Sequence, residues 1–208
     1  MQPLSPSQRE TLEEATTSYQ GAVTSDAARY LLHRGIEEAT AVTFRLGVVV
    51  DPLPGHERYR GMLAIPYLHR DGHPVSMRFR RLASEGPKYL GLPEDPTRMF
   101  NTAAIYRAAS EIHVTEGEFD AMILNQIGLP AIAIPGATNW KYHYAVALAG
   151  FSRVWVWGDP DEAGHEFVGT VSRAMRQARG VRLKQGDVTD TYLQGGKSAL
   201  LDLIQGDR

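Results

Sequence analysis

Carboxylates follow three predicted strands in the second half of the chain, at or near the point where each strand ends. In the string VTEGEFDA, Glu116 comes directly after a strand predicted at 112–115, and the next residue, a glycine, permits a sharp turn into a helix. In the string VWVWGDPDEAG, Asp159 and Asp161 follow a strand predicted at 154–157. The third group is Asp187 and Asp190, after a strand predicted at 181–183.

These groups favour a site for a hard divalent cation. Aspartates two residues apart repel each other, and both stay ionised at low cost only beside a positive charge. Oxygen ligands without histidine or cysteine suit Mg²⁺ or Mn²⁺ and not zinc. The alternative is ordinary helix capping, because acids in a first turn complement the helix dipole. Capping explains Glu118 and Asp120 well, but it explains Glu116 poorly because that residue stands at the end of a strand.

The elements that must position these acids alternate between strand and helix. Apolar strands are predicted at 112–115, 131–134, 154–157 and 181–183, with helices at 118–127, 140–149, 163–178 and 198–204. This alternation predicts a parallel sheet covered on both faces. The carboxyl ends of such strands meet at one rim, where polar chemistry is carried out. Trp155 and Trp157 lie inside an apolar strand, so we expect them in the core and not stacked on bases.

The first half of the chain has a different pattern. A polar helix or arm is expected at the periphery up to residue 24, followed by a helical hairpin over 25–44. Short apolar stretches at 46–50, 62–67 and 74–79, separated by turn residues, predict an antiparallel or mixed sheet. The expected fold class is α/β, with a parallel-sheet domain over 109–208 preceded by a smaller α+β subdomain over 25–108.

Composition limits the classes of function. The formal net charge is −2, no residue is cysteine, and no apolar run approaches the roughly 20 residues that span a bilayer. The polar N-terminus has no secretion signal, so we expect a cytoplasmic protein without a membrane partner. The distribution of charge is uneven: residues 58–81 hold six arginines and one acid. Such a segment suits a phosphate backbone, although a solvated charged face is the simpler interpretation.

Taken together, the motifs resemble the Toprim domain of bacterial-type primases, type IA and II topoisomerases and some nucleases. That family has a Glu-Gly after its first strand, here Glu116-Gly117, and an Asp-x-Asp-x-x-Gly after its third, here Asp159, Asp161 and Gly164. The upstream strings AARYLLHRGI, IPYLHRDGHPVSMRFRR, GPKYL and MFNTAAIY resemble the RNA-polymerase core of bacterial primases. The resemblance runs from about residue 26 to residue 193 in the family's order, and it implies a Toprim-type parallel-sheet domain.

The resemblance implies roles for particular residues. Glu116 would bind metal and act as general acid or base, and Asp159 and Asp161 would bind divalent metal, helped by Asp187 or Asp190. The implied cofactor is Mg²⁺ or Mn²⁺, with no zinc. Basic residues that the family keeps for template or nucleotide phosphates fall at Arg80 and Lys88, and Arg34 is a further candidate. Arg78 could serve similarly, although packing or a salt bridge explains it at least as well.

Two residues depart from the family's pattern. Thr102 stands where the family usually has a lysine. Glu118 stands where cellular primases often have an aromatic residue, and in this respect the motif is more similar to that of phage helicase–primases. Without cysteine the chain has no zinc-binding template module, so a separate zinc-binding chain and a replicative helicase are expected partners. The short form favours a phage-encoded protein acting in a bacterial cell.

The implied function is a DNA primase core, a DNA-directed RNA polymerase that copies single-stranded DNA into short RNA primers from ribonucleoside triphosphates. Two alternatives remain open. One is a Toprim-type nuclease with the same metal site, and the other is a non-catalytic subunit that binds single-stranded DNA. The acid set counts against a pure binder, because carboxylates beside phosphates repel them.

Overall fold

The chain divides into two compact units, Met1–Pro96 (unit 1) and Thr97–Arg208 (unit 2), in a computed structural model that describes residues 4–83, 85–136 and 139–206. This division differs from the boundary expected after residue 108. The residues before the helix α4 (Ala103–Arg107) belong to unit 2, because Phe100 exchanges two backbone hydrogen bonds with Ala133 in the sheet of that unit.

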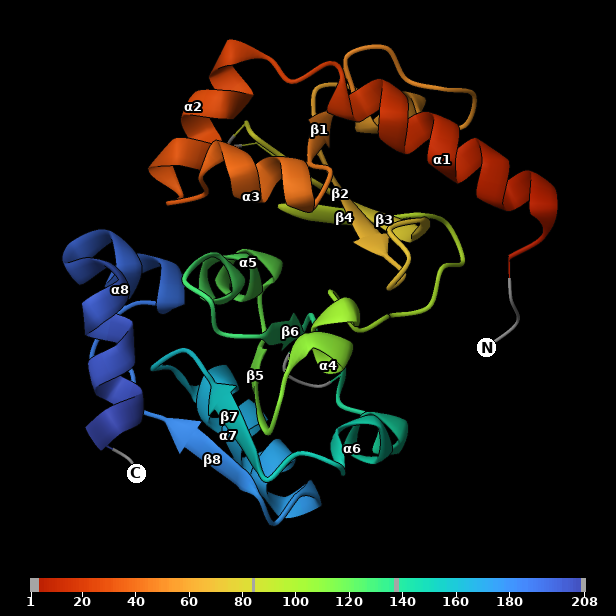
Figure 1. Cartoon of the computed structure of the whole chain (residues 1–208). Helices are drawn as coiled ribbons and strands as arrows, with labels where there is room; N and C mark the ends of the chain where they lie inside the picture. The colour runs from red at the N-terminus through yellow and green to blue at the C-terminus, as the bar shows by residue number, and fades with distance from the viewer. Residues whose placement is uncertain (1–3, 84, 137–138, 207–208) are drawn as a thin grey trace. The chain divides into compact units, whose positions relative to one another are not determined.

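Unit 1 is a four-stranded antiparallel sheet with three α-helices. The helical hairpin was predicted, and so were three of the strands; β4 was missed because its three residues lie among glycines and prolines that are typical of a loop. The strands pair in the order β1-β2-β3-β4 (Figure 1). The elements are α1 (Pro6–Gln20), α2 (Ser25–His33), α3 (Glu38–Thr43), β1 (Gly47–Val48), the 3₁₀ helix η1 (Glu57–Tyr59), β2 (Leu63–Leu68), β3 (Pro74–Arg80) and β4 (Tyr89–Gly91).

Helix α1 is part of the core of unit 1, not the peripheral arm expected from its polar sequence. Leu12, Ala15 and Tyr19 are buried and pack with residues of the sheet. Between them, Glu14, Thr17 and Ser18 face solvent, which makes the segment look hydrophilic, whereas Thr16 is buried and its hydroxyl donates to the carbonyl oxygen of Leu12. The helix approaches β1 so closely that a Cβ on Gly47 would lie 2.2 Å from the backbone carbon of Tyr19. Glycine at this position is therefore what lets α1 dock.

Unit 2 contains the predicted parallel sheet. Its four strands pair in the order β6-β5-β7-β8, every pair parallel, with β5 and β7 in the centre. Helices connect successive strands (Figure 1), so the mixed α/β class is confirmed. The elements after α4 are β5 (Glu111–Thr115), α5 (Glu118–Gln126), β6 (Ala131–Ala133), α6 (Tyr142–Leu148), β7 (Arg153–Trp157), α7 (Glu162–Ala174), β8 (Ala178–Val181) and α8 (Val188–Gly206).

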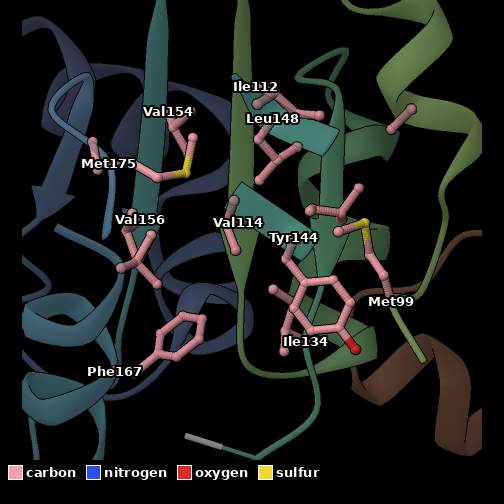
Figure 2. Packing of buried hydrophobic residues seen from close by; sticks show 14 residues of the cluster. Met99, Ile112, Val114, Ile134, Tyr144, Leu148, Val154, Val156, Phe167 and Met175 are labelled. Atoms are coloured by element: carbon pink, nitrogen blue, oxygen red, sulfur yellow. The ribbon is translucent and has the colours of Figure 1, made fainter. Parts of the chain in front are cut away.

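The core of unit 2 forms where α6 and α7 pack on the sheet. Figure 2 shows Val114 and Val156 of the central strands beside Phe167 of α7 and Tyr144 of α6. Trp155 and Trp157 are buried, as predicted. Their indole N–H groups are both satisfied: Trp155 donates to Glu111 at 2.9 Å, and Trp157 donates to Nδ1 of His113 at 3.0 Å.

The last strand and its flanking helices differ from the prediction. Helix α7 ends at Ala174 and β8 covers Ala178–Val181, whereas the sequence predicted a helix to residue 178 and a strand at 181–183. Residues 176–179 are good helix formers, but pairing with β7 overrides this weak preference. Helix α8 (Val188–Gly206) is interrupted at Gly196, whose backbone is not helical: the part after it contains the helix predicted at 198–204, and the part before it was not predicted. Within the described ranges, no helix is both long and apolar enough to cross a membrane.

Candidate functional site

Two of the predicted carboxylate groups lie at the same edge of the parallel sheet. Strands β5 and β7 are neighbours, and their last residues, Thr115 and Trp157, are paired in register. Glu116 follows the first strand directly, and Asp159 comes two residues after the second. Because parallel strands end at one rim, the sheet brings these side chains close together.

The pKa of Glu116 is strongly perturbed at these two junctions. Burial, together with the neighbouring carboxylates of Asp159 and Asp161, raises its pKa to about 7, while a hydrogen bond from the backbone N–H of Asp159 acts in the opposite direction. Its Oε1 atom is buried without a hydrogen-bond partner. A buried carboxylate oxygen that faces only other acids is stabilised when a cation binds it.

The Asp-x-Asp-x-x-Gly pattern has a local structural reason. Asp161 is the N-cap of α7, and its Oδ1 accepts the backbone N–H of Gly164 at 2.8 Å. The first turn of α7 folds tightly over the preceding loop, and a Cβ on Gly164 would lie 2.1 Å from the carbonyl oxygen of Asp159. The glycine is therefore needed to hold Asp159 and Asp161 in one turn. Capping and a second role are compatible, because the cap uses one carboxylate oxygen.

The carboxylate of Asp120 joins α5 to the start of α8 by two hydrogen bonds with Thr189. Oδ1 of Asp120 accepts the backbone N–H of Thr189 at 3.1 Å and its hydroxyl at 2.9 Å. Burial raises the pKa of Asp120, and the carboxylates of Asp187 and Asp159 raise it further. Asp120 thus lies within electrostatic reach of both the β7 junction and α8. Asp187 is brought to this edge by α8, not by the end of β8, which lies six residues earlier.

Asp190 has a capping role in this structure. Its backbone N–H donates to Oδ1 of Asp187 at 2.7 Å, and its Oδ2 accepts the backbone N–H of Asp187 at 3.3 Å. This reciprocal pair is a capping box. Of the two alternatives predicted from the sequence, the geometry favours Asp187 as the member near the other acids.

Sequence reasoning gave too little weight to two residues of this site. Asp120 was attributed to the helix dipole, yet it stands four residues after Glu116, which places both on one side of the strand–helix turn. Thr189 was not singled out at all. It is fully buried, and no local motif marks it, because its partner lies 69 positions earlier.

The donor set fits a hard divalent cation. It consists of carboxylates, the ligands that suit Mg²⁺ and Mn²⁺, and the chain has no cysteine. Within the described ranges, no three Asp, Glu, His or Cys residues are close enough together to hold a metal ion by themselves. Binding would therefore need small movements of these side chains, or oxygen ligands from a phosphate and water, as is usual for Mg²⁺.

The predicted phosphate-binding arginines of unit 1 form an aromatic cluster with Tyr89. The guanidinium of Arg78 lies 4.6 Å from the centre of the Tyr89 ring and that of Arg80 lies 5.1 Å from it. Arg80 is buried, donates to the Tyr89 hydroxyl, and also lies over the ring of Tyr30 at 5.5 Å. The β3–β4 pairing produces this contact, because Arg80 is directly opposite Tyr89. Tyr89 was not predicted as part of the cluster.

The other two basic residues predicted from the sequence differ in exposure. Lys88 is exposed next to β4, and Arg34, the C-cap of α2, is partly buried. Lys88 can therefore meet a phosphate in solvent, whereas Arg34 has less freedom to move.

Comparisons with known proteins find a phage protein and bacterial DNA primases among the relatives of this chain. No family model matches the chain. The gene 57 protein of Mycobacterium phage D29 is 38% identical over 151 residues, which cover 70% of this chain and 99% of that protein. The DNA primase of Haemophilus influenzae is 23% identical over 244 aligned positions, covering 94% of this chain and 41% of that protein. The chain therefore belongs to the same family as the phage gene 57 protein, and it is similar to bacterial DNA primases over most of its length. It spans less than half the length of that curated primase.

Solved primase structures share the fold. The zinc-binding and RNA-polymerase domains of the Aquifex aeolicus primase superpose with a TM-score of 0.83 at 20% identity, covering 98% of this chain and 62% of that one. A DnaG primase catalytic domain bound to single-stranded DNA gives a TM-score of 0.79 at 20% identity, covering 95% of this chain and 78% of that one. Nearly the whole chain therefore has the fold of a primase core.

Proposed function

We propose that this chain is a primase catalytic core that synthesises short RNA primers on single-stranded DNA by metal-dependent nucleotidyl transfer. The observation that carries the proposal is the set of mutually repelling carboxylates around Glu116, at the carboxyl edge of a sheet with the primase-core fold. A protein that only binds DNA gains nothing from buried acids beside phosphates, because like charges raise the cost of binding.

In this proposal Glu116, Asp159 and Asp161 hold Mg²⁺ or Mn²⁺, with Asp120 and Asp187 at the same edge. The ions would neutralise charge on the incoming triphosphate and lower the pKa of the attacking 3′-hydroxyl. The carboxylates themselves fix the ions in position, and Glu116, whose pKa is about 7 in the metal-free site, gives up its proton when an ion binds. Asp159 also positions Glu116 through its backbone N–H.

Phosphates of template or nucleotide are assigned to the basic residues of unit 1. Lys88 is exposed and can make a point contact, while Arg78 and Arg80 are oriented by Tyr89. Arg34 is a further candidate at the end of α2. Contacts of this kind fix the position of a nucleic acid without reading its sequence. A replicative helicase is the proposed protein partner.

The test is primer synthesis on single-stranded DNA with ribonucleoside triphosphates and Mg²⁺ or Mn²⁺. We expect Glu116→Gln and Asp159→Asn each to reduce the rate by about 10²-fold or more, because each removes charge that stabilises the transition state. Asp202→Asn is the matched control, since it removes an exposed carboxylate from α8 away from the site. Unchanged synthesis by either site variant would refute the assignment of these residues.

The same protein preparations separate the two alternative functions. A nuclease would cut DNA with Mg²⁺ in the absence of nucleotides, and Glu116→Gln would abolish the cutting. A non-catalytic binding subunit would bind DNA equally well after chelation of metals and in Glu116→Gln. We expect no DNA cutting in the absence of nucleotides, and we expect primer synthesis in addition to DNA binding.

A further inference from the structure

Unit 2 carries a run of exposed bases that the proposed function does not use. Residues 173–184 include five bases and no acid, although unit 2 has more acids than bases overall. All five are exposed, and none forms an ion pair with a carboxylate among the described residues. The five, which we call the β8 strip, are Arg173, Arg176, Arg179, Arg182 and Lys184.

The β8 strip follows the free edge of the parallel sheet. Strand β8 is the last strand in the order β6-β5-β7-β8 and pairs only with β7 (Figure 1). Arg179 lies in β8, Arg176 precedes it, and Arg182 and Lys184 follow it. Buried Val181 and Leu183 alternate with exposed Arg182 and Lys184, so the apolar side chains anchor the segment and the bases point to solvent.

Part of the strip is held in place by the backbone. Nη1 of Arg179 donates to the carbonyl oxygens of Arg176 at 3.0 Å and Ala178 at 2.8 Å. The guanidinium is thereby oriented while its other N–H groups stay available. An arginine fixed in this way loses less entropy when it binds an anion.

The strip leads toward the carboxylate edge. Lys184 stands three residues before Asp187, which is within electrostatic reach of Asp120. From Arg176 to Lys184 the backbone can span at most roughly 26 Å, enough to follow several phosphates of one strand. A polyanion lying on this edge would therefore have one end close to the proposed metal site.

Two other roles explain the exposed bases of the β8 strip less well than nucleic-acid binding does: protection of the sheet edge and binding of a protein. Charged side chains on an edge strand prevent sheet-to-sheet aggregation, but this needs one or two charges and does not require bases in the flanking loops. A protein interface requires large apolar anchors, and no described residue of 173–184 is among the exposed large hydrophobic residues. Repeated bases without apolar anchors are typical of a phosphate-backbone contact.

We propose that the β8 strip binds the phosphate backbone of single-stranded DNA that is engaged at the carboxylate edge of unit 2. The inference rests on the proposed function, because it takes the bound strand to be the template. The contacts are independent of sequence, since they involve charge and backbone phosphates only. They add a second set of template contacts to those assigned to unit 1.

The experiment measures binding of a fluorescein-labelled oligothymidylate to the full chain by fluorescence anisotropy over a range of salt concentrations. The test variant is Arg176→Gln with Arg182→Gln. The matched control is Lys141→Gln with Lys197→Gln, which removes the same charge from exposed positions of unit 2 outside the strip. Each single-strand phosphate contact contributes about 0.7 to the slope of log K against log salt concentration.

We expect the test variant to bind about tenfold more weakly at low salt and to lose about 1.4 from the slope, which corresponds to two lost contacts. The control variant should keep the wild-type slope. Wild-type binding by the test variant would overturn the proposal. So would equal losses in both variants, because that result would reflect net charge alone.

Primer synthesis separates this inference from the proposed function. At saturating template we expect the Arg176→Gln, Arg182→Gln variant to keep its kcat, while KM for the template rises in proportion to the lost affinity. If neither the wild type nor any variant synthesises primers, the proposed function is refuted. Weaker DNA binding by the test variant, but not by the control, would still support a DNA-binding role for the β8 strip. If synthesis requires Glu116 but the strip variant binds normally, the function stands and the strip proposal fails.

Discussion

At the scale of single residues, the candidate site is a set of acids whose mutual repulsion is left uncompensated by the protein. Glu116 has a pKa near 7 because it is buried and faces Asp159 and Asp161. A cation that binds there must displace the proton from a partly protonated group, so metal binding releases protons. The acids are thus arranged for a positive ligand and not for the stability of the folded chain.

Thr189 is expected to position Asp120 for metal binding. In Thr189→Val the hydroxyl donor to Asp120 is lost while the shape is kept, and the carboxylate becomes free to turn. We expect roughly tenfold weaker Mn²⁺ binding, in line with the loss of an outer hydrogen bond to a ligand. The measurement is a direct Mn²⁺ titration followed by electron paramagnetic resonance.

Thr189→Ser is the matched control, because it keeps the hydroxyl, and it should restore the affinity for Mn²⁺. If Thr189→Val binds Mn²⁺ as the wild type does, Thr189 has no part in positioning Asp120. Equal weakening in Thr189→Ser, which keeps the hydroxyl, would show that the lost hydrogen bond does not explain the effect.

His113 is expected to make stability depend on pH. Its ring is buried and its Nδ1 accepts the indole N–H of Trp157, so burial lowers the pKa from 6.5 to about 3. Between these values the unfolded chain binds a proton that the folded chain excludes. The contribution of His113 to the free energy of unfolding is therefore complete above pH 6.5. It is lost as the pH falls toward 3, by up to about 1.4 kcal/mol per pH unit.

The variant His113→Asn keeps an acceptor for Trp157 but cannot titrate. We expect the free energy of unfolding, measured with urea, to fall less between pH 6.5 and 5 in the variant than in the wild type. The raised pKa of Glu116 changes stability in the opposite direction over this pH range, but it does so equally in both proteins. The difference between the two curves therefore isolates the contribution of His113. Parallel curves would mean that His113 is charged, or exposed, in the folded state.

At the scale of elements, the β7–α7 turn is the unit that holds the aspartates. Gly164→Ala would place a Cβ within 2.1 to 2.8 Å of backbone atoms of Asp159, and backbone cannot yield as a flexible side chain can. We expect this variant to lose Mn²⁺ affinity and at least about 2 kcal/mol of stability, as overpacking does.

Gly169→Ala is the matched control on the same helix. There the new Cβ meets only the end of the Arg173 side chain at 3.1 Å. Alanine also favours helix over glycine by up to about 1 kcal/mol. We expect equal or higher stability in urea and unchanged Mn²⁺ binding. A Gly164→Ala variant as stable as Gly169→Ala would contradict the account of the turn.

The elements also show where sequence reasoning succeeds and where it stops. Strands β5 and β7 were predicted nearly to the residue, because their apolar runs are bounded by charged residues and turns. The α7–β8 boundary was misplaced, because Arg176, Gln177 and Ala178 carry a helical preference that pairing with β7 outweighs. Of the site, the acids after β5 and β7 were predictable from spacing, whereas the Asp120–Thr189 bond depends on a contact between distant segments.

At the scale of the whole molecule, the two-part organisation followed from the change in hydrophobic pattern, but the role of the N-terminal helix did not. The sequence of α1 is mostly polar, and only its packing on β1 and β3 shows that it completes the core of unit 1. The boundary between the units was also displaced, because the Phe100–Ala133 bridge could not be anticipated from local residues.

Docking of α1 can be tested at Gly47. In Gly47→Ala the new Cβ would overlap the backbone of Tyr19 and Gln20, so α1 must move away from the sheet. We expect a loss of stability of about 2 kcal/mol or more, and faster amide hydrogen exchange in α1 and β1. Gly91→Ala is the control in the same sheet, because no atom lies within 4 Å of its new Cβ. Unchanged protection of α1 in Gly47→Ala would show that the close approach is not needed.

The strand order of unit 2 also bears on how this unit can fold while the chain is being synthesised. The central strand β5 is made first, β6 and β7 can then add on either side of it, and β8 adds to β7. Each nascent strand therefore finds a neighbour that has already been synthesised, and domains tend to form in this N-to-C direction. Asp187 and the helix α8, which carries Thr189, follow β8 in the chain, so the carboxylate cluster can be completed only after all the strands of this sheet have been synthesised.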